Sequence, residues 1–183
     1  EGYEHLLRID FFAAPGREET ARVIEALEQG ARREPVKRTA ARSGTIDSGG
    51  FRKRIWVTRP RPGVDRMSSA WLIRRFIDPD AHFLWLETPS DCPSNALGFA
   101  FDGAAFTHIA NRVTFEVLLA SFGLDLDGGL QRLGAMVHAL DVGGAFVPEA
   151  HGFESMMAGA RQRAIDDDQL LAEISMVLDS LYA

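Results

Sequence analysis

The sequence predicts an α/β domain with a small parallel or mixed sheet and a predominantly helical second half. Two observations lead to this fold class. Between residues 55 and 86, an apolar run, an amphipathic helical pattern and a second apolar run follow one another, which is the order of a βαβ unit. After residue 113, apolar residues recur at helical spacing nearly to the end of the chain.

The first predicted strand is the apolar run at residues 55–58, and proline and glycine residues make the turn after it. Asp65 is the expected N-cap of the following helix, which extends through Ile77. Residues 82–86 form the second predicted strand. Residues 99–101 are a candidate third strand. A strand, a helix and a strand within about thirty residues imply a parallel pair.

Apolar stripes predict four helices in the second half. They cover residues 115–122, where Gly123 ends the helix, residues 130–140, a segment after Pro148, and residues 170–181. Three consecutive aspartates from Asp166 precede the last stripe, and acidic residues stabilise a helix N-terminus. The helices therefore outweigh the sheet.

The beginning of the chain is organised differently. Residues 1–32 have a helical pattern. Residues 33–50 contain proline, glycine, serine and threonine without an apolar period, which indicates a linker. The predicted domain then covers residues 51–183.

Composition excludes several protein classes. The chain has 183 residues, of which 46% are hydrophobic and 25% charged, so it is not a largely disordered protein. No apolar run approaches the ~18 residues that a transmembrane helix needs, so no membrane partner is expected. The single cysteine, Cys92, excludes an internal disulfide and a cysteine-rich zinc site. With no visible signal peptide, this favours a cytoplasmic location.

Positive charge is concentrated at the strand–helix junction. The net charge is −6, yet residues 31–75 hold thirteen arginines and lysines against three acidic residues, a local charge of +10. The turn after the first strand leads into a helix N-terminus, which favours anions. Guanidinium and hydroxyl groups suit an oxyanion. The candidate anion ligands are Arg59, Arg61, Arg66, Ser68 and Ser69. The alternative is a surface loop whose arginines pair with nearby acids.

Histidine and acidic residues form a second candidate set. Imidazole and carboxylate together suit zinc, manganese or iron. His138 and Asp141 are three residues apart on a predicted helix, so they point to one face. The alternative is that each histidine is an ordinary hydrogen-bonded residue. The candidate metal ligands are His108, Glu116, His138 and Asp141, with Asp65 as a possible further ligand. Asp102 belongs to the same scattered set of histidine and acidic residues.

These motifs resemble the chromate resistance protein ChrB family, in its carboxyl-terminal domain. The long motif at residues 59–79 carries the resemblance. Shorter matches are Phe106-Thr107-His108, residues 114–119, His138-x-x-Asp141 and the Asp179-Ser180-Leu181-Tyr182 ending. The resemblance covers residues 53–183. It implies that residues 1–32 are the helical tail of an amino-terminal region that is otherwise missing.

The resemblance implies a function in chromate resistance. Members are described as chromate-responsive regulators of transcription, so we expect a sensor or accessory domain in a stress response. Chromate or a similar oxyanion is the expected partner, and DNA would be contacted only through the missing amino-terminal region. The alternative is a metal-dependent hydrolase, because Asp65 before Ser68-Ser69 and Asp102 before Phe106-Thr107-His108 lie in a layout similar to that of Asp-His-His metal phosphoesterases. Glu116 would then be the base. Whether the domain is catalytic stays open here, as does its oligomeric state.

Overall fold

The computed structural model describes residues 46–88 and 91–183, which belong to the second of two compact units, Gly44–Ala183. The predicted helical segment 1–32 and most of the predicted linker lie outside the described residues. At the end of that linker, Ser48–Gly50 forms a short 3₁₀ turn, η1.

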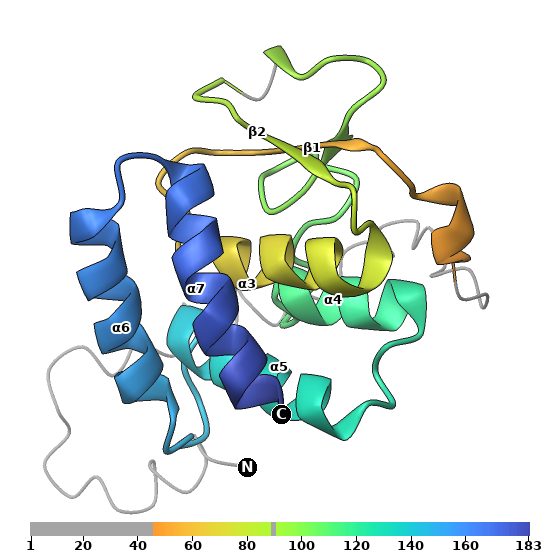
Figure 1. Cartoon of the computed structure of the whole chain (residues 1–183). Coiled ribbons are helices and arrows are strands. Elements are labelled where there is room, and N and C mark those ends of the chain that lie inside the picture. Colours follow the sequence, from red (N-terminus) through yellow and green to blue (C-terminus); the bar gives the residue numbers. More distant parts are fainter. Residues whose placement is uncertain (1–45, 89–90) are drawn as a thin grey trace, which may run out of the picture. The chain divides into compact units, whose positions relative to one another are not determined.

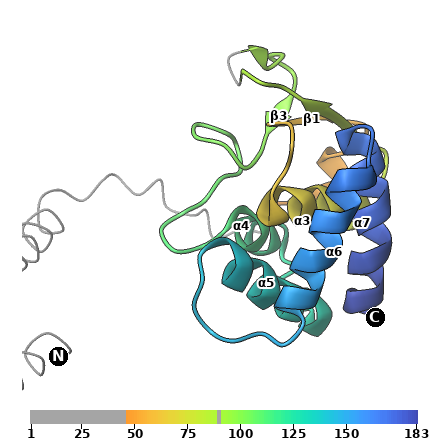
Figure 2. The same cartoon turned by 90° about the vertical axis from the view of Figure 1, so that its left-hand side faces the viewer.

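The sheet confirms the predicted βαβ unit. Strands β1 (Ile55–Thr58) and β2 (His82–Trp85) pair in parallel, and β3 (Leu97–Gly98) pairs in parallel with the other side of β1. The strand order is β2-β1-β3; Figure 1 labels β2 and β1, and Figure 2 labels β3. The third strand precedes its predicted position at residues 99–101. Ala100 adopts a φ of 57°, which ends the extended conformation there.

Helix α3 (Val64–Leu72) and the π-helical turn η2 (Ile73–Ile77) connect β1 to β2. Helix α3 lies at the centre of the domain, because it packs against α4, α5 and α7 (Figure 1). The chain then continues through η2 to β2. All of its residues from Met67 to Leu72 are buried, as expected for a helix surrounded by other elements. The predicted N-cap is wrong: Gly63 is the N-cap, and Asp65 lies inside the first turn.

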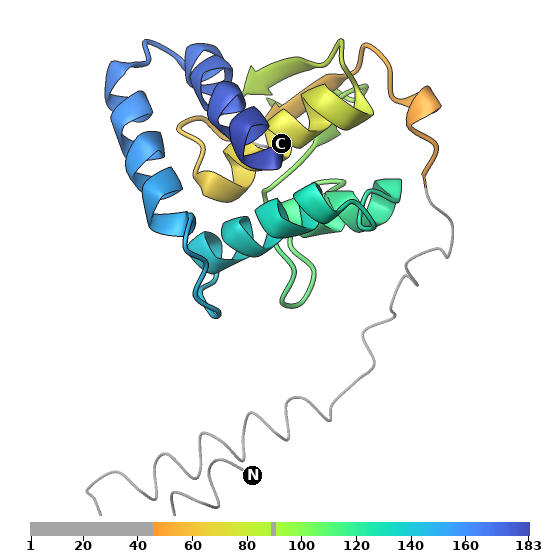
Figure 3. The same cartoon turned by 60° about the horizontal axis from the view of Figure 1, so that its bottom comes forward.

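The four helices of the second half confirm the apolar stripes. They are α4 (Thr114–Phe122), α5 (Gly128–Asp141), α6 (Ala150–Arg163) and α7 (Asp167–Tyr182). Gly123 ends α4 with a φ of 66°, and Asp166 caps α7. Helices α6 and α7 lie side by side (Figure 3). The segment after β3 leads from the sheet to the start of α4 (Figure 2).

One hydrophobic core joins the sheet to these helices, with Trp56, Trp71 and Phe115 among its largest buried side chains. The buried carboxylate of Asp78 links the start of the sheet to this core. Asp78 is fully buried and accepts hydrogen bonds from the backbone N–H groups of Lys53 and Arg54 and from the Trp56 indole. Within the described ranges, no helix combines the length and the apolar character that crossing a membrane requires.

Candidate functional site

A pocket of about 320 Å³ lies where two loops leave the sheet. One loop follows β1 and leads into α3, and the other follows β3. In open α/β sheets, ligands bind beyond the carboxyl ends of the strands, where neighbouring strands connect in opposite directions. Here β2, which follows β1 along the chain, pairs on one side of β1, and β3 pairs on its other side. The pocket therefore occupies the expected position. Its lining is Arg59, Gly63, Asp65, Arg66, Ala100, Phe101, Asp102, Thr107, His108 and Asp141.

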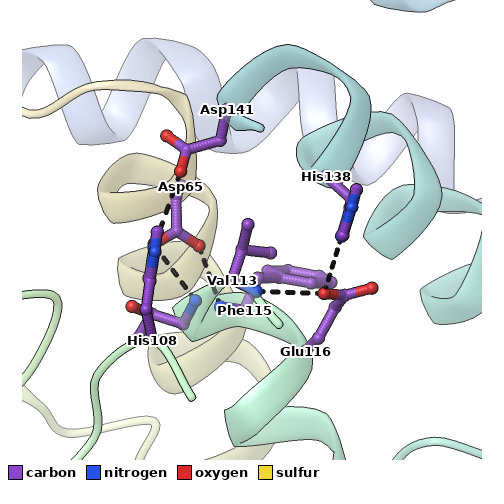
Figure 4. Close-up of polar contacts among 8 residues, drawn as sticks. Asp65, His108, Val113, Phe115, Glu116, His138 and Asp141 are labelled. Atoms are coloured by element: carbon purple, nitrogen blue, oxygen red, sulfur yellow. Dashed lines mark hydrogen bonds and ion pairs between the residues drawn. The ribbon is translucent and has the colours of Figure 1, made fainter. Parts of the chain in front are cut away.

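Three side chains from distant parts of the chain converge in this pocket (Figure 4). His108 Nε2 lies 3.0 Å from Asp65 Oδ2 and 3.5 Å from Asp141 Oδ2. One ligand atom from each of the three residues falls within 4.8 Å of the others, a spacing that could hold a metal ion. We call these three residues the carboxylate–histidine cluster. Three ligands would leave coordination positions open for a further molecule.

The protein holds Asp65 rigidly. Its carboxylate accepts hydrogen bonds from the backbone N–H groups of Thr114 (3.2 Å, to Oδ2) and Phe115 (2.9 Å, to Oδ1). Those N–H groups belong to the first turn of α4, where no partner exists within the helix. Asp65 thus caps α4 rather than its own helix. Only Oδ2 faces His108, so the capping bonds orient that oxygen toward the pocket.

Asp141 is the electrostatically strained member of the cluster. Its side chain is 30% exposed and lies at the last residue of α5. Burial raises the pKa of its carboxyl group, and the nearby charge of Asp65 raises it further. His108, Arg66 and His138 act in the opposite direction and lower that pKa. Two neighbouring carboxylates therefore repel each other here, and a cation would relieve that repulsion.

The other two predicted metal ligands form a separate pair. His138 Nδ1 lies 3.0 Å from Glu116 Oε2, and that oxygen also accepts a hydrogen bond from the backbone N–H of Val113 at 3.0 Å. In Figure 4 this pair and the cluster lie on opposite sides of the start of α4. Glu116 lines a different pocket of about 260 Å³, together with Arg112 and Gln131. The structure thus brings His108, Asp141 and Asp65 together, and it pairs Glu116 with His138.

The predicted anion ligands are also divided. Arg59 and Arg66 line the pocket, and within residues 46–88 and 91–183 neither guanidinium group forms a hydrogen bond or an ion pair. Arg61 does not line it, and its backbone N–H donates to Asp167 instead. Ser68 and Ser69 are fully buried inside α3, away from the pocket lining.

Sequence reasoning did not assign Thr107 or Phe101 to the site, and it gave Asp102 no specific role. All three lie in the segment after β3. Had β3 been predicted at its correct position, this segment would have been a candidate for the site, because it follows the carboxyl end of a parallel strand.

Comparisons with known proteins agree on the family. The family model described as "ChrB, C-terminal domain" matches residues 56–183. Over 132 residues, the chain is 64% identical to Protein ChrB of Cupriavidus metallidurans. That alignment covers 72% of this chain but only 41% of the relative. No solved structure matches the chain. The chain belongs to the ChrB family, through its carboxyl-terminal domain.

Proposed function

We propose that this domain serves chromate resistance by binding a divalent metal ion and an oxyanion in the pocket beyond β1 and β3. ChrB family membership supports the chromate connection. The alignment spans less than half of the longer relative. The domain is accordingly proposed as the sensor or accessory part of a larger regulator, whose amino-terminal region would contact DNA.

The observation that carries the proposal is the carboxylate–histidine cluster with two arginines in one pocket. Two carboxylate oxygens and one imidazole nitrogen suit zinc, manganese or iron(II). His108 Nε2 lies 3.0 Å from Asp65 Oδ2, and it would bind a metal through its lone pair with the ring proton on Nδ1. Metal binding should weaken at low pH, because protonation of the ligand groups competes with the metal.

Metal analysis of the purified, untagged chain tests the proposal. After incubation with Zn²⁺, Mn²⁺ or Fe²⁺ and removal of excess metal, we expect close to one ion per chain. His108→Ala should lose this ion. His138→Ala is the matched control, because it removes a histidine of the neighbouring pair with Glu116, and it should retain the metal. No bound metal in the folded wild-type chain would refute the proposed metal site.

Anion binding is tested separately with chromate, sulfate and phosphate, each added to the metal-loaded protein. Guanidinium groups form charge-assisted hydrogen bonds to any of these anions. A rise in melting temperature with chromate that sulfate does not reproduce supports a chromate-selective sensor. Equal shifts with all three anions would exclude selectivity at this site.

The hydrolase alternative shares the metal cluster, since three protein ligands with open positions also occur in metal-dependent hydrolases. Glu116, its expected base, bonds to His138 and does not line the pocket. Turnover of a panel of phosphoesters by the metal-loaded chain, lost in His108→Ala, would favour this alternative over the sensor.

A further inference from the structure

We infer that the oxyanion binds this pocket more tightly once the metal is bound, and that the charge of Arg66 acts on the clustered carboxylates before metal binding and on the anion after it. The inference rests on the proposed function and specifies how its two ligands depend on each other. In the metal-free domain, Arg66 partly compensates the clustered carboxylates. In the metal-loaded domain, it is available to the anion.

The charge of the pocket supports this dependence of anion binding on the metal. Its lining holds three carboxylates, on Asp65, Asp102 and Asp141, against the two guanidinium groups of Arg59 and Arg66. With His108 neutral, the lining has a net charge of −1, which disfavours a dianion. A divalent ion in the cluster changes this charge to +1. The same arginines then face a neutralised cluster, and the pocket becomes complementary to a tetrahedral dianion.

Arg66 is the residue best placed to respond to the metal. It follows Asp65 directly in the first turn of α3, and it lines the pocket. The same pocket is lined by Asp65, His108 and Asp141, so the Arg66 side chain shares it with the whole carboxylate–histidine cluster. No salt bridge within 4.0 Å fixes it there among the described residues. The side chain is thus near the cluster without being bound to it.

This placement gives Arg66 two opposite effects. A cation beside the cluster competes with a metal ion for the same carboxylates, so Arg66 should weaken metal binding. A guanidinium group beside a bound metal should strengthen oxyanion binding. Arg59 lines the pocket from the loop after β1, whereas Arg66 is the direct chain neighbour of Asp65. Arg59 should therefore affect the anion more than the metal.

Titration calorimetry on the full 183-residue chain separates these effects. Mn²⁺ is titrated into metal-free protein with and without sulfate, and then sulfate and chromate are titrated with and without Mn²⁺. We expect Mn²⁺ to tighten anion binding by about tenfold or more, within the ~5–150-fold range of typical couplings. Linkage requires that the anion tighten Mn²⁺ binding by the same factor.

Variants identify the residue responsible. Arg66→Gln should bind Mn²⁺ about threefold to tenfold more tightly, on the scale of one partly screened charge. It should lose part of the coupling and keep the part that comes from the charge of the metal itself. Arg59→Gln should weaken the anion with little change for Mn²⁺. Arg61→Gln is the matched control, since this arginine lies in the same loop outside the pocket lining, and both affinities should stay at the wild-type values.

The outcomes distinguish this inference from the proposed function. If Mn²⁺ binds but sulfate and chromate affinities do not depend on it, the coupling is refuted while the metal site stands. If Arg66→Gln weakens Mn²⁺ binding, or couples like wild type, the role of Arg66 is refuted. If neither Mn²⁺, Zn²⁺ nor Fe²⁺ binds, the proposed metal site itself is refuted, and the inference with it.

Discussion

The two aspartates of the cluster should affect stability in opposite directions, although both are proposed to bind the same metal. Asp65 is 4% exposed and accepts two backbone N–H groups from α4. A hydrogen bond to a charged group contributes about 1.5–3 kcal/mol. Asp65→Ala should therefore lower the free energy of unfolding by about 3–6 kcal/mol. Asp65→Asn retains one acceptor oxygen and should lose roughly half of that.

Asp141 offers the opposite case. Within the described residues its carboxylate accepts no backbone N–H, and its closest polar contact is His108 at 3.5 Å. Its negative charge lies at the C-terminal end of α5, where the helix dipole disfavours it. The charge of Asp65 disfavours it as well. Asp141→Asn removes that charge with little change in shape, so the metal-free protein should become more stable.

Urea denaturation in the presence of a chelator measures both effects at pH 7. The slope of the free energy against urea concentration should stay constant across the variants, so that midpoints compare stabilities directly. Metal analysis of the same variants, prepared without chelator and incubated with Mn²⁺, should show that Asp65→Asn and Asp141→Asn both lose the ion that the wild type binds. The reasoning is refuted if Asp65→Asn is as stable as wild type, or if Asp141→Asn is less stable.

The pH dependence of Asp141→Asn provides a control with a defined sign. Because its folded-state pKa is raised above 3.8, the folded protein holds this proton more tightly than the unfolded chain. The favourable contribution is complete below pH 3.8 and is lost as the pH rises through the folded-state pKa. The stability gained in Asp141→Asn should therefore grow with pH across this window and then become constant.

Three further predictions concern the scaffold. A Cβ on Gly129 would lie 2.8 Å from the Tyr182 ring and 2.9 Å from its backbone oxygen, whereas one on Gly128 meets nothing within 4 Å. Calorimetric melting should then show Gly129→Ala destabilised and Gly128→Ala stabilised, the latter by about 0.4–1 kcal/mol. The backbone N–H of Leu130 and, as the second cause, the Tyr182 hydroxyl donate to Asp127 and lower its pKa below 3.8, and the same bond to Asp127 raises the pKa of Tyr182 above 10.0. The contribution of the Tyr182–Asp127 bond should be lost as the pH rises above 10 or falls below 3.8. In urea titrations, Tyr182→Phe should lack the dependence above pH 10 and should keep a reduced dependence below pH 3.8, because Leu130 still donates to Asp127. Asp78→Asn places an amide among three donors, so that a buried donor loses its acceptor. This substitution should lower the free energy of unfolding in urea denaturation by about 2–4 kcal/mol. Wild-type stability in this variant would contradict the role assigned to Asp78.

Local patterns were sufficient to predict most of the elements. The apolar stripe at residues 115–122 and the glycine at position 123 predicted α4 almost to the residue. The run at residues 55–58 predicted β1. The position of β3 was predicted wrongly, because a two-residue strand has almost no pattern of its own. Its register depends on pairing with β1, which is a long-range contact.

The candidate site also separates what local patterns predict from what depends on long-range contacts. The sequence identified all three members of the cluster, but grouped them with Glu116 and His138. Helical spacing places His138 and Asp141 on one helix, three residues apart. It does not reveal that one bonds to Glu116 and the other lies beside His108. Those partners come from α4 and from the loop after β3, and only the packing of these elements decides which is within reach.

By itself, the sequence determined the family, the βαβ unit, the helices and the residue types available for binding. Each of these depends on periodicity or on a contiguous motif. The tertiary structure decided the roles of individual side chains. Asp65 caps a helix that begins 49 residues later, Arg66 lines the pocket, and Ser68 and Ser69 are buried among neighbouring helices. These roles depend on contacts between distant segments, whose geometry is set by the packing of the whole core rather than by spacing along the chain.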